Sequence, residues 1–208
     1  MAAPRVQART RLARAAVVDA ARRLFVERGY GATTIDAISD LAGVPQATVY
    51  RLFSSKHGIL KSLLDVSVAG DDEDVPMAQR PHVRSLLDAS DPAAQLSGFV
   101  AMAVDVNRRV APIHRVLLSA ADTDPEPAAL LDELTQQRQR GQRVIARSLA
   151  KAGALRPGLR ERDAADVIHA LLSPELYRLL VVDRGWKPDR YERWLVTTLT
   201  EQLLPAGG

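Results

Sequence analysis

Residues 33–56 read TTIDAISDLAGVPQATVYRLFSSK, and this stretch decides the fold. Thr33 and Asp36 have the spacing of a capping box, in which a hydroxyl residue is followed three positions later by an acidic one. This spacing predicts a short helix over residues 34–42. Gly43 then supplies a tight turn, so the chain can reverse and begin a second helix.

The second short helix is predicted over residues 46–53. Pro45 fits its first turn, where the missing N–H of proline costs nothing. Two helices joined by a tight glycine turn form a helix-turn-helix unit. Apolar side chains would hold the two helices at a fixed angle, namely Ile35, Ile38, Val44, Val49 and Leu52.

The side chains left exposed on the second helix are a suitable set for the major groove of DNA. Amide and guanidinium groups bind base edges, small residues contact thymine methyl groups, and hydroxyls bind phosphates. The set is Gln46, Ala47, Thr48, Tyr50 and Arg51. A generic helical hairpin within an all-α protein is the alternative interpretation of the same pattern.

Helical signals continue outside this unit, and no alternating Val/Ile/Thr-rich run predicts a strand. A first helix is expected from about Thr10 to Arg28, with Leu12 in its apolar stripe and Gly29 as a left-handed cap. A longer helix begins near Lys56. The acidic stretch over residues 70–76 is a break and the best candidate for a boundary loop.

Prolines that follow Asp or Ser mark several later helix starts. One helix is expected from Pro92 to about Arg109, and another from Pro125 to about Ala152. A helix that begins near Glu161 restarts or kinks at Pro174, and a last one follows Pro188. The sequence therefore predicts an all-α fold.

Charge is distributed unevenly along the chain. The net charge is +3, yet residues 1–56 contain nine Arg and Lys against four Asp and Glu. A basic front end on a nearly neutral body indicates that the front meets a polyanion.

One order of residues extends over about residues 11–65 without insertion. It comprises Ala21-x-x-Leu24-Phe25-x-x-x-Gly29-Tyr30-x-x-Thr33-Thr34-Ile35, then Ile38, Ala42-Gly43-Val44, Thr48-Val49-Tyr50 and Phe53-x-x-Lys56. This order closely resembles the N-terminal signature of the TetR family of transcriptional regulators. A segment from Ser173 to Leu195 also resembles a tail found in many such regulators.

The resemblance implies a three-helix DNA-binding domain over residues 1–55 and an all-helical effector-binding and dimerisation domain over residues 56–208. It also implies that Thr34, Tyr50 and Lys56 contact phosphates, while Gln46, Ala47, Thr48 and Arg51 face the groove. Three residues depart from the family pattern. Ser39 replaces the usual alanine, with its hydroxyl expected to bond back to the Ile35 carbonyl; Pro45 replaces a serine cap, and Ala47 a frequent glycine.

A homodimer on a palindromic operator is the expected assembly, because two recognition helices one DNA turn apart bind more tightly than one. The helix near residues 130–149 and the two-sided apolar segment 164–182 predict the interface. Its candidate residues are Leu134, Val144, Ile145, Ile168 and Leu172. A central helix in a single-chain core is the alternative for this segment.

A small, largely apolar effector is expected to bind within residues 56–150. Candidate lining residues are Phe99, Met102, Val106, Arg109, His114 and Leu118. Arg109 and His114 could meet an acidic effector or simply face water. The sequence does not name the ligand, and a regulator without an effector or with a corepressor is the alternative.

Enzymatic activity is not expected. The four histidines are scattered, the chain has no cysteine, and no phosphate-binding loop, dinucleotide fingerprint or nucleophile elbow is present. Neither a cofactor nor a metal site is therefore predicted. The first ten residues lack the apolar core of a signal peptide and no stretch is long enough to span a membrane, so a cytoplasmic location is expected.

Overall fold

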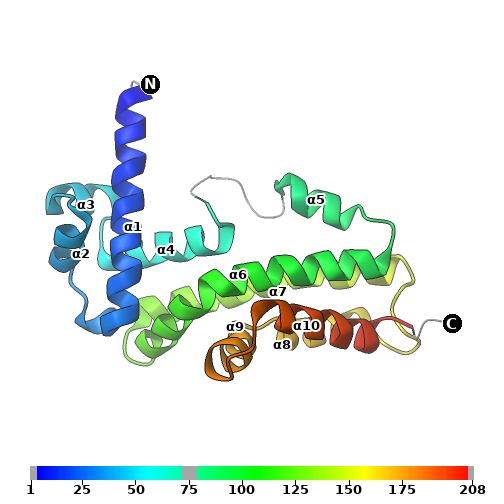
Figure 1. Cartoon of the computed structure of the whole chain (residues 1–208). Coiled ribbons are helices and arrows are strands. Elements are labelled where there is room, and N and C mark those ends of the chain that lie inside the picture. The colour runs from blue at the N-terminus through cyan, green and yellow to red at the C-terminus, as the bar shows by residue number, and fades with distance from the viewer. Residues whose placement is uncertain (1–3, 72–78, 206–208) are drawn as a thin grey trace. The chain divides into compact units, whose positions relative to one another are not determined.

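A computed structural model of the chain describes residues 4–71 and 79–205, and within these ranges it contains helices and no strand (Figure 1). The described residues form two compact units. The first comprises residues 4–71 and 112–132, and the second comprises residues 79–111 and 133–205. Most of the predicted break at 70–76 lies outside the described residues. The all-α prediction is confirmed.

Four helices make up most of the first unit. They are α1 (Pro4–Ala32), α2 (Ile35–Ala42), α3 (Gln46–Phe53) and α4 (Lys56–Ala69). α1 begins six residues earlier than predicted and includes a break at Gly29, whose φ of 82° and ψ of 166° are not helical. Gly29 thus has the positive φ expected of it, although its ψ is not that of a left-handed cap.

The core of the first unit lies where α1 packs against α2 and α4. Its fully buried side chains include Phe25, Ile38, Val49, Ile59 and Leu63. Each such side chain contributes roughly 1.5–3 kcal/mol of burial free energy. Leu12 was predicted to join this apolar stripe, but it is 71% exposed, because it precedes the part of α1 that the other helices cover.

The later helices are α5 (Pro81–Leu87), α6 (Pro92–Ala121), α7 (Pro125–Lys151), α8 (Glu161–Leu171), α9 (Pro174–Tyr177), the π-helix η2 (Arg178–Asp183) and α10 (Pro188–Leu203). The starts predicted at Pro92, Pro125, Pro174 and Pro188 are confirmed. α6 does not end near Arg109 as predicted. It continues through Pro112 to Ala121, since a proline inside a helix removes one hydrogen bond without necessarily ending it.

The core of the second unit joins α6, α7, α8 and α10. It includes Leu96, Val100, Leu149, Tyr191 and Leu195, each fully buried. Asn107 fastens α6 to the end of α8, because its side-chain amide donates a hydrogen bond of 3.0 Å to the Leu172 carbonyl. None of the described helices is both long and apolar enough to span a membrane.

Three of the residues predicted to form the dimer interface are packed within the chain itself. Ile145, Ile168 and Leu172 are at most 1% exposed and belong to the core of the second unit. Their side chains therefore have no surface to offer a partner, and that part of the interface prediction is wrong. The alternative of a single-chain core is correct for these positions. Val144 is 46% exposed and Leu134 is half-buried.

Candidate DNA interface

The turn between α2 and α3 is held by caps at both ends of α2. Thr34 is the N-cap, and its side-chain oxygen accepts a hydrogen bond of 3.1 Å from the Ala37 N–H. Gly43 ends the helix in the left-handed region, with φ 62° and ψ 29°, at the position predicted for the turn. Loss of such an N-cap costs about 1 kcal/mol.

Two local predictions in α2 are wrong by a small shift. Thr33 is not the capping residue. It is buried, and its hydroxyl donates to the carbonyls of Leu24 and Gly29, so it ties the end of α1 to the start of α2. The Ser39 hydroxyl donates to the Val44 carbonyl at 2.6 Å and not to Ile35. That bond crosses the turn and fixes α3 relative to α2.

The recognition helix α3 presents one side to solvent and one to the core. Pro45 occupies the N-cap position of α3, and its carbonyl accepts hydrogen bonds from the Thr48 and Val49 N–H groups. Val49 and Phe53 are buried. Among the predicted groove residues, Gln46, Ala47, Tyr50 and Arg51 are exposed, whereas Thr48 is half-buried.

Gln46 is joined to the start of α2. Its side-chain nitrogen donates a hydrogen bond of 2.8 Å to a carboxylate oxygen of Asp36. Both side chains are exposed, and Asp36 lies in the first turn of α2. The capping-box spacing gives no sign of this pair, because Asp36 lies ten residues from Gln46 on another helix.

Lys56 lies at the start of α4 and reaches back to the end of α1. Its ammonium donates to the carbonyls of Tyr30 at 2.8 Å and Thr33 at 3.0 Å, and it lies 4.2 Å from the centre of the Tyr30 ring. Burial lowers the pKa of Lys56 from its usual value, against the opposing charge of Asp124. Because an ammonium has three N–H donors, one donor remains for the predicted phosphate contact.

Tyr30 is buried beneath Lys56 and stays protonated. Burial, reinforced by the carboxylates of Asp124 and Glu126, raises the pKa of Tyr30 to about 12. Those two carboxylates lie at the start of α7, within the same compact unit. The carboxylates at the α6–α7 connection therefore contribute to the electrostatic environment of Lys56 and Tyr30. The same two residues join α1 to α4.

The junction of α3 and α4 requires a glycine, although no spacing in the sequence marks it. A Cβ atom on Gly58 would lie 2.0 Å from the Phe53 carbonyl oxygen. Ser54 ends α3 with φ 65°, and Ser55 caps α4 by accepting from the Gly58 N–H. The end of the recognition helix and the first turn of α4 are thus in direct backbone contact.

Arg14 braces the same junction from α1. Its guanidinium donates to the Leu52 carbonyl at 2.9 Å and to the Ser62 hydroxyl at 3.3 Å, and it lies over the Phe53 ring at 4.6 Å. Nothing local in the sequence separates Arg14 from the other arginines near the N-terminus. Its role depends on residues 38 and 48 positions away.

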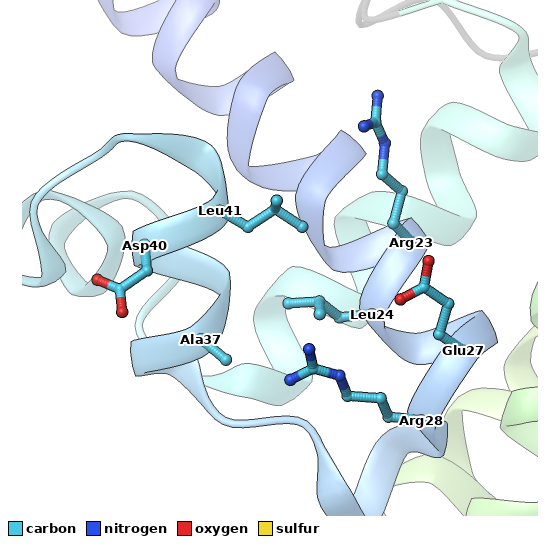
Figure 2. A pocket seen from close by; sticks show the side chains of 7 residues that line it. All are labelled: Arg23, Leu24, Glu27, Arg28, Ala37, Asp40 and Leu41. Carbon is cyan, nitrogen blue, oxygen red and sulfur yellow. The ribbon is translucent and has the colours of Figure 1, made fainter.

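An open groove of about 580 Å³ lies between α1 and α2 (Figure 2). Arg23, Leu24, Glu27 and Arg28 of α1 line it, together with Ala37, Asp40 and Leu41 of α2. Its charged rim carries both signs. None of the predicted effector residues lines this groove.

The predicted effector residues differ in exposure. Phe99 and His114 are buried, Met102, Val106 and Arg109 are half-buried, and Leu118 is 38% exposed. The Arg109 guanidinium forms an ion pair with Asp105, four residues earlier on α6. An acidic effector would therefore have to compete with that carboxylate.

Residues 17–63 match the family described as bacterial regulatory proteins, tetR family. The chain is also 29% identical over 182 residues to the HTH-type transcriptional regulator YdeS of Bacillus subtilis (strain 168), covering 87% of this chain and 84% of YdeS. The match places residues 17–63 in the TetR family. The chain is a DNA-binding transcriptional regulator and not an enzyme.

The fold extends over whole solved structures. NalD of Pseudomonas aeruginosa, the secondary repressor of the MexAB-OprM multidrug efflux pump, aligns with a TM-score of 0.75 at 23% identity, over 96% of this chain and 99% of NalD. A transcriptional regulator of Saccharomonospora viridis, solved in complex with choline, aligns with a TM-score of 0.69 at 21% identity, over 93% of this chain and 98% of that one. Both likenesses show the fold.

Proposed function

We propose that the protein is a homodimeric repressor that binds a palindromic operator and is released by a small-molecule effector. The observation that carries the DNA-binding part is the two-sided recognition helix. Val49 and Phe53 fix α3 in the core, while Gln46, Tyr50 and Arg51 remain exposed on a helix short enough to enter a major groove.

The exposed residues divide by the chemistry of their side chains. Gln46 and Arg51 carry the planar donor groups that bind base edges, and Ala47 and Thr48 offer small groups to thymine methyls. Tyr50, Thr34 and Lys56 carry the hydroxyls and the ammonium that suit phosphates. Thr34 retains its hydroxyl proton for a phosphate, because its oxygen acts as an acceptor in the cap.

The dimer is assigned to apolar side chains that the second unit leaves exposed. Val144 on α7 is 46% exposed, and Leu179 and Val182 in η2 are 48% and 62% exposed. Exposed apolar side chains mark an association surface where they gather in one patch, which the dimer proposal requires of these three. A twofold dimer would bring two recognition helices to the two halves of a palindrome.

The effector is proposed to bind within residues 56–150 and to lower operator affinity. The choline complex of the S. viridis regulator shows that this fold accommodates a small molecule, and NalD is a repressor. The functional boundary is proposed at residues 55 and 56, where α4 begins. Because its proposed target is DNA, the protein is proposed to act in the cytoplasm.

A gel-shift titration tests the proposal. Palindromic duplexes from the region upstream of the protein's own gene are titrated against a shuffled duplex of equal length and composition. Preferential binding that Arg51→Ala reduces is the expected result. Equal affinity for every duplex, at several salt concentrations, would contradict the assignment of an operator.

The regulatory part has its own test. A thermal-shift screen of metabolites and drugs identifies ligands, and each hit is then added to an operator titration. A ligand must bind the operator-free form more tightly than the operator-bound form to release DNA. Weaker operator binding is expected, about ten- to a hundredfold for a typical allosteric coupling; tighter binding would instead identify a corepressor.

A further inference from the structure

We propose that Asp36 is a specificity-determining residue that acts through Gln46 and makes it reject guanine. The inference rests on the proposed function, since it requires α3 to lie in a major groove. It adds a residue of α2 to the set that decides the operator sequence.

The hydrogen bond from Gln46 to Asp36 fixes the orientation of the amide. A carboxylate accepts hydrogen bonds and donates none, so Gln46 must turn its nitrogen toward Asp36, at 2.8 Å. The flipped amide would place its oxygen against a carboxylate oxygen, and two acceptors repel. The carboxylate thus removes one of the two orientations that an unattached glutamine adopts.

The fixed amide presents its oxygen at the free edge. That oxygen accepts from a base with an amino group in the major groove, which adenine offers at N6 and cytosine at N4. Guanine offers only the acceptors N7 and O6 there, and thymine offers O4 and a methyl group. The held amide keeps one N–H for the base, so it can pair with adenine through its oxygen and that N–H. It can satisfy only one of the two guanine acceptors and turns its oxygen toward the other, whereas an unattached glutamine can offer guanine both N–H groups.

The negative charge of Asp36 also disfavours guanine. Its negative charge lies beside the amide that meets the base, and guanine turns two electronegative acceptors toward the groove. The carboxylate also lies in the first turn of α2, where the helix dipole stabilises it.

A selection experiment measures the base preference even though the operator sequence is not yet identified. The probe is a pool of synthetic duplexes with two randomised inverted half-sites, and the bound fraction is sequenced for the wild type and for each variant. The wild type is expected to disfavour guanine about tenfold or more at the base pair that Gln46 contacts, in both half-sites. Gln46→Ala identifies that base pair.

Asp36→Asn is the decisive variant, because an asparagine of nearly the same shape both donates and accepts. It lets Gln46 flip, so the penalty against guanine should fall to about twofold at that base pair alone. Asp40→Asn is the matched control. It removes the same charge from the same helix at a carboxylate that lines the α1–α2 groove (Figure 2), and it should leave the preference unchanged.

The outcomes distinguish a failure of the proposed function from a failure of the role of Asp36. If the wild type selects no sequence, the proposed function fails. If it selects a palindrome and Asp36→Asn keeps the wild-type penalty against guanine, the role of Asp36 is wrong while the function stands. Equal changes in Asp36→Asn and Asp40→Asn would also overturn it, since they would report general charge. Thermal melting of each variant confirms that the compared proteins are folded.

Discussion

At the scale of single residues, Lys56 has a structural role and a proposed phosphate-binding role, and Lys56→Ala removes both. Lys56→Ala removes two charge-assisted hydrogen bonds to the Tyr30 and Thr33 carbonyls. Such bonds are worth roughly 1.5–3 kcal/mol when buried, and the half-exposed position of Lys56 reduces this to about 1 kcal/mol. We expect a lower melting temperature together with weaker binding to all DNA sequences alike.

Salt dependence distinguishes the phosphate contact of Lys56 from its structural contacts. Loss of one phosphate contact reduces the slope of log affinity against log salt by about one. Arg23→Ala is a suitable control, because Arg23 pairs with Asp19 on the exposed side of α1. An unchanged slope in Lys56→Ala would assign Lys56 to the scaffold alone.

His169 provides a prediction about pH. A guanidinium can only donate, so Arg138 must donate to Nε2 of His169 at 3.0 Å, and Nδ1–H donates to Gln142 at 2.6 Å. The ring is therefore neutral. Burial, reinforced by the charge of Arg138, lowers the pKa of His169, while Glu175 and Asp166 oppose the shift.

The sign of the stability change follows from this lowered pKa. Below about pH 6.5 the unfolded chain takes up a proton that the folded chain resists, so acid costs stability by at most about 1.4 kcal/mol per pH unit. His169→Gln keeps the polar contacts and has no such proton. Urea unfolding at pH 7.5 and 5.5 should show a larger loss for the wild type than for His169→Gln; equal losses would contradict the prediction.

At the scale of secondary-structure elements, the α3–α4 junction depends on Gly58. A Cβ atom there would lie 2.0 Å from a backbone oxygen at the end of the recognition helix. Gly58→Ala must therefore shift α3 against α4, at a cost of about 1–3 kcal/mol. We expect lower stability and, because α3 moves, a loss of operator affinity.

Gly31→Ala is the matched control for that substitution. An added Cβ at Gly31 meets nothing within 4 Å, and its φ lies outside the left-handed region. The change should be neutral or stabilise slightly, because alanine restricts the unfolded chain. Similar urea midpoints for the two variants would show that the close approach at Gly58 is not required.

At the scale of the whole molecule, the dimer proposal predicts different results for buried and exposed apolar residues. Val144→Asp places a charge on an exposed side chain of α7 and should give folded monomers. Ile168→Asp should instead unfold the second unit, because it places an unpaired charge in a filled core. Sedimentation and circular dichroism distinguish a monomer from an unfolded chain.

A control on the other unit completes this experiment. Val26 on α1 is 37% exposed and lies in the first unit. Val26→Asp should leave the oligomeric state unchanged. A wild type that sediments as a monomer at micromolar concentration would reject the homodimer.

The sequence by itself determined the helix-turn-helix. The residues that start and end these helices act through the few residues beside them, so their effect can be predicted from the sequence alone. They are Gly43, the hydroxyl residues near 33–34 and the prolines that begin later helices. The exposure of Gln46, Tyr50 and Arg51 also followed, because a short helix with a known buried side leaves the rest to solvent.

Only the tertiary structure decided which partners those residues have. Periodicity showed that Ile168 and Leu172 lie on a buried face, but it did not show whether their own chain or a second copy covers it. Lys56 reaches carbonyls 23 and 26 residues away, and Gln46 meets a carboxylate ten residues away on another helix. Such contacts depend on how helices pack, and packing is set by the summed fit of many side chains rather than by any local spacing.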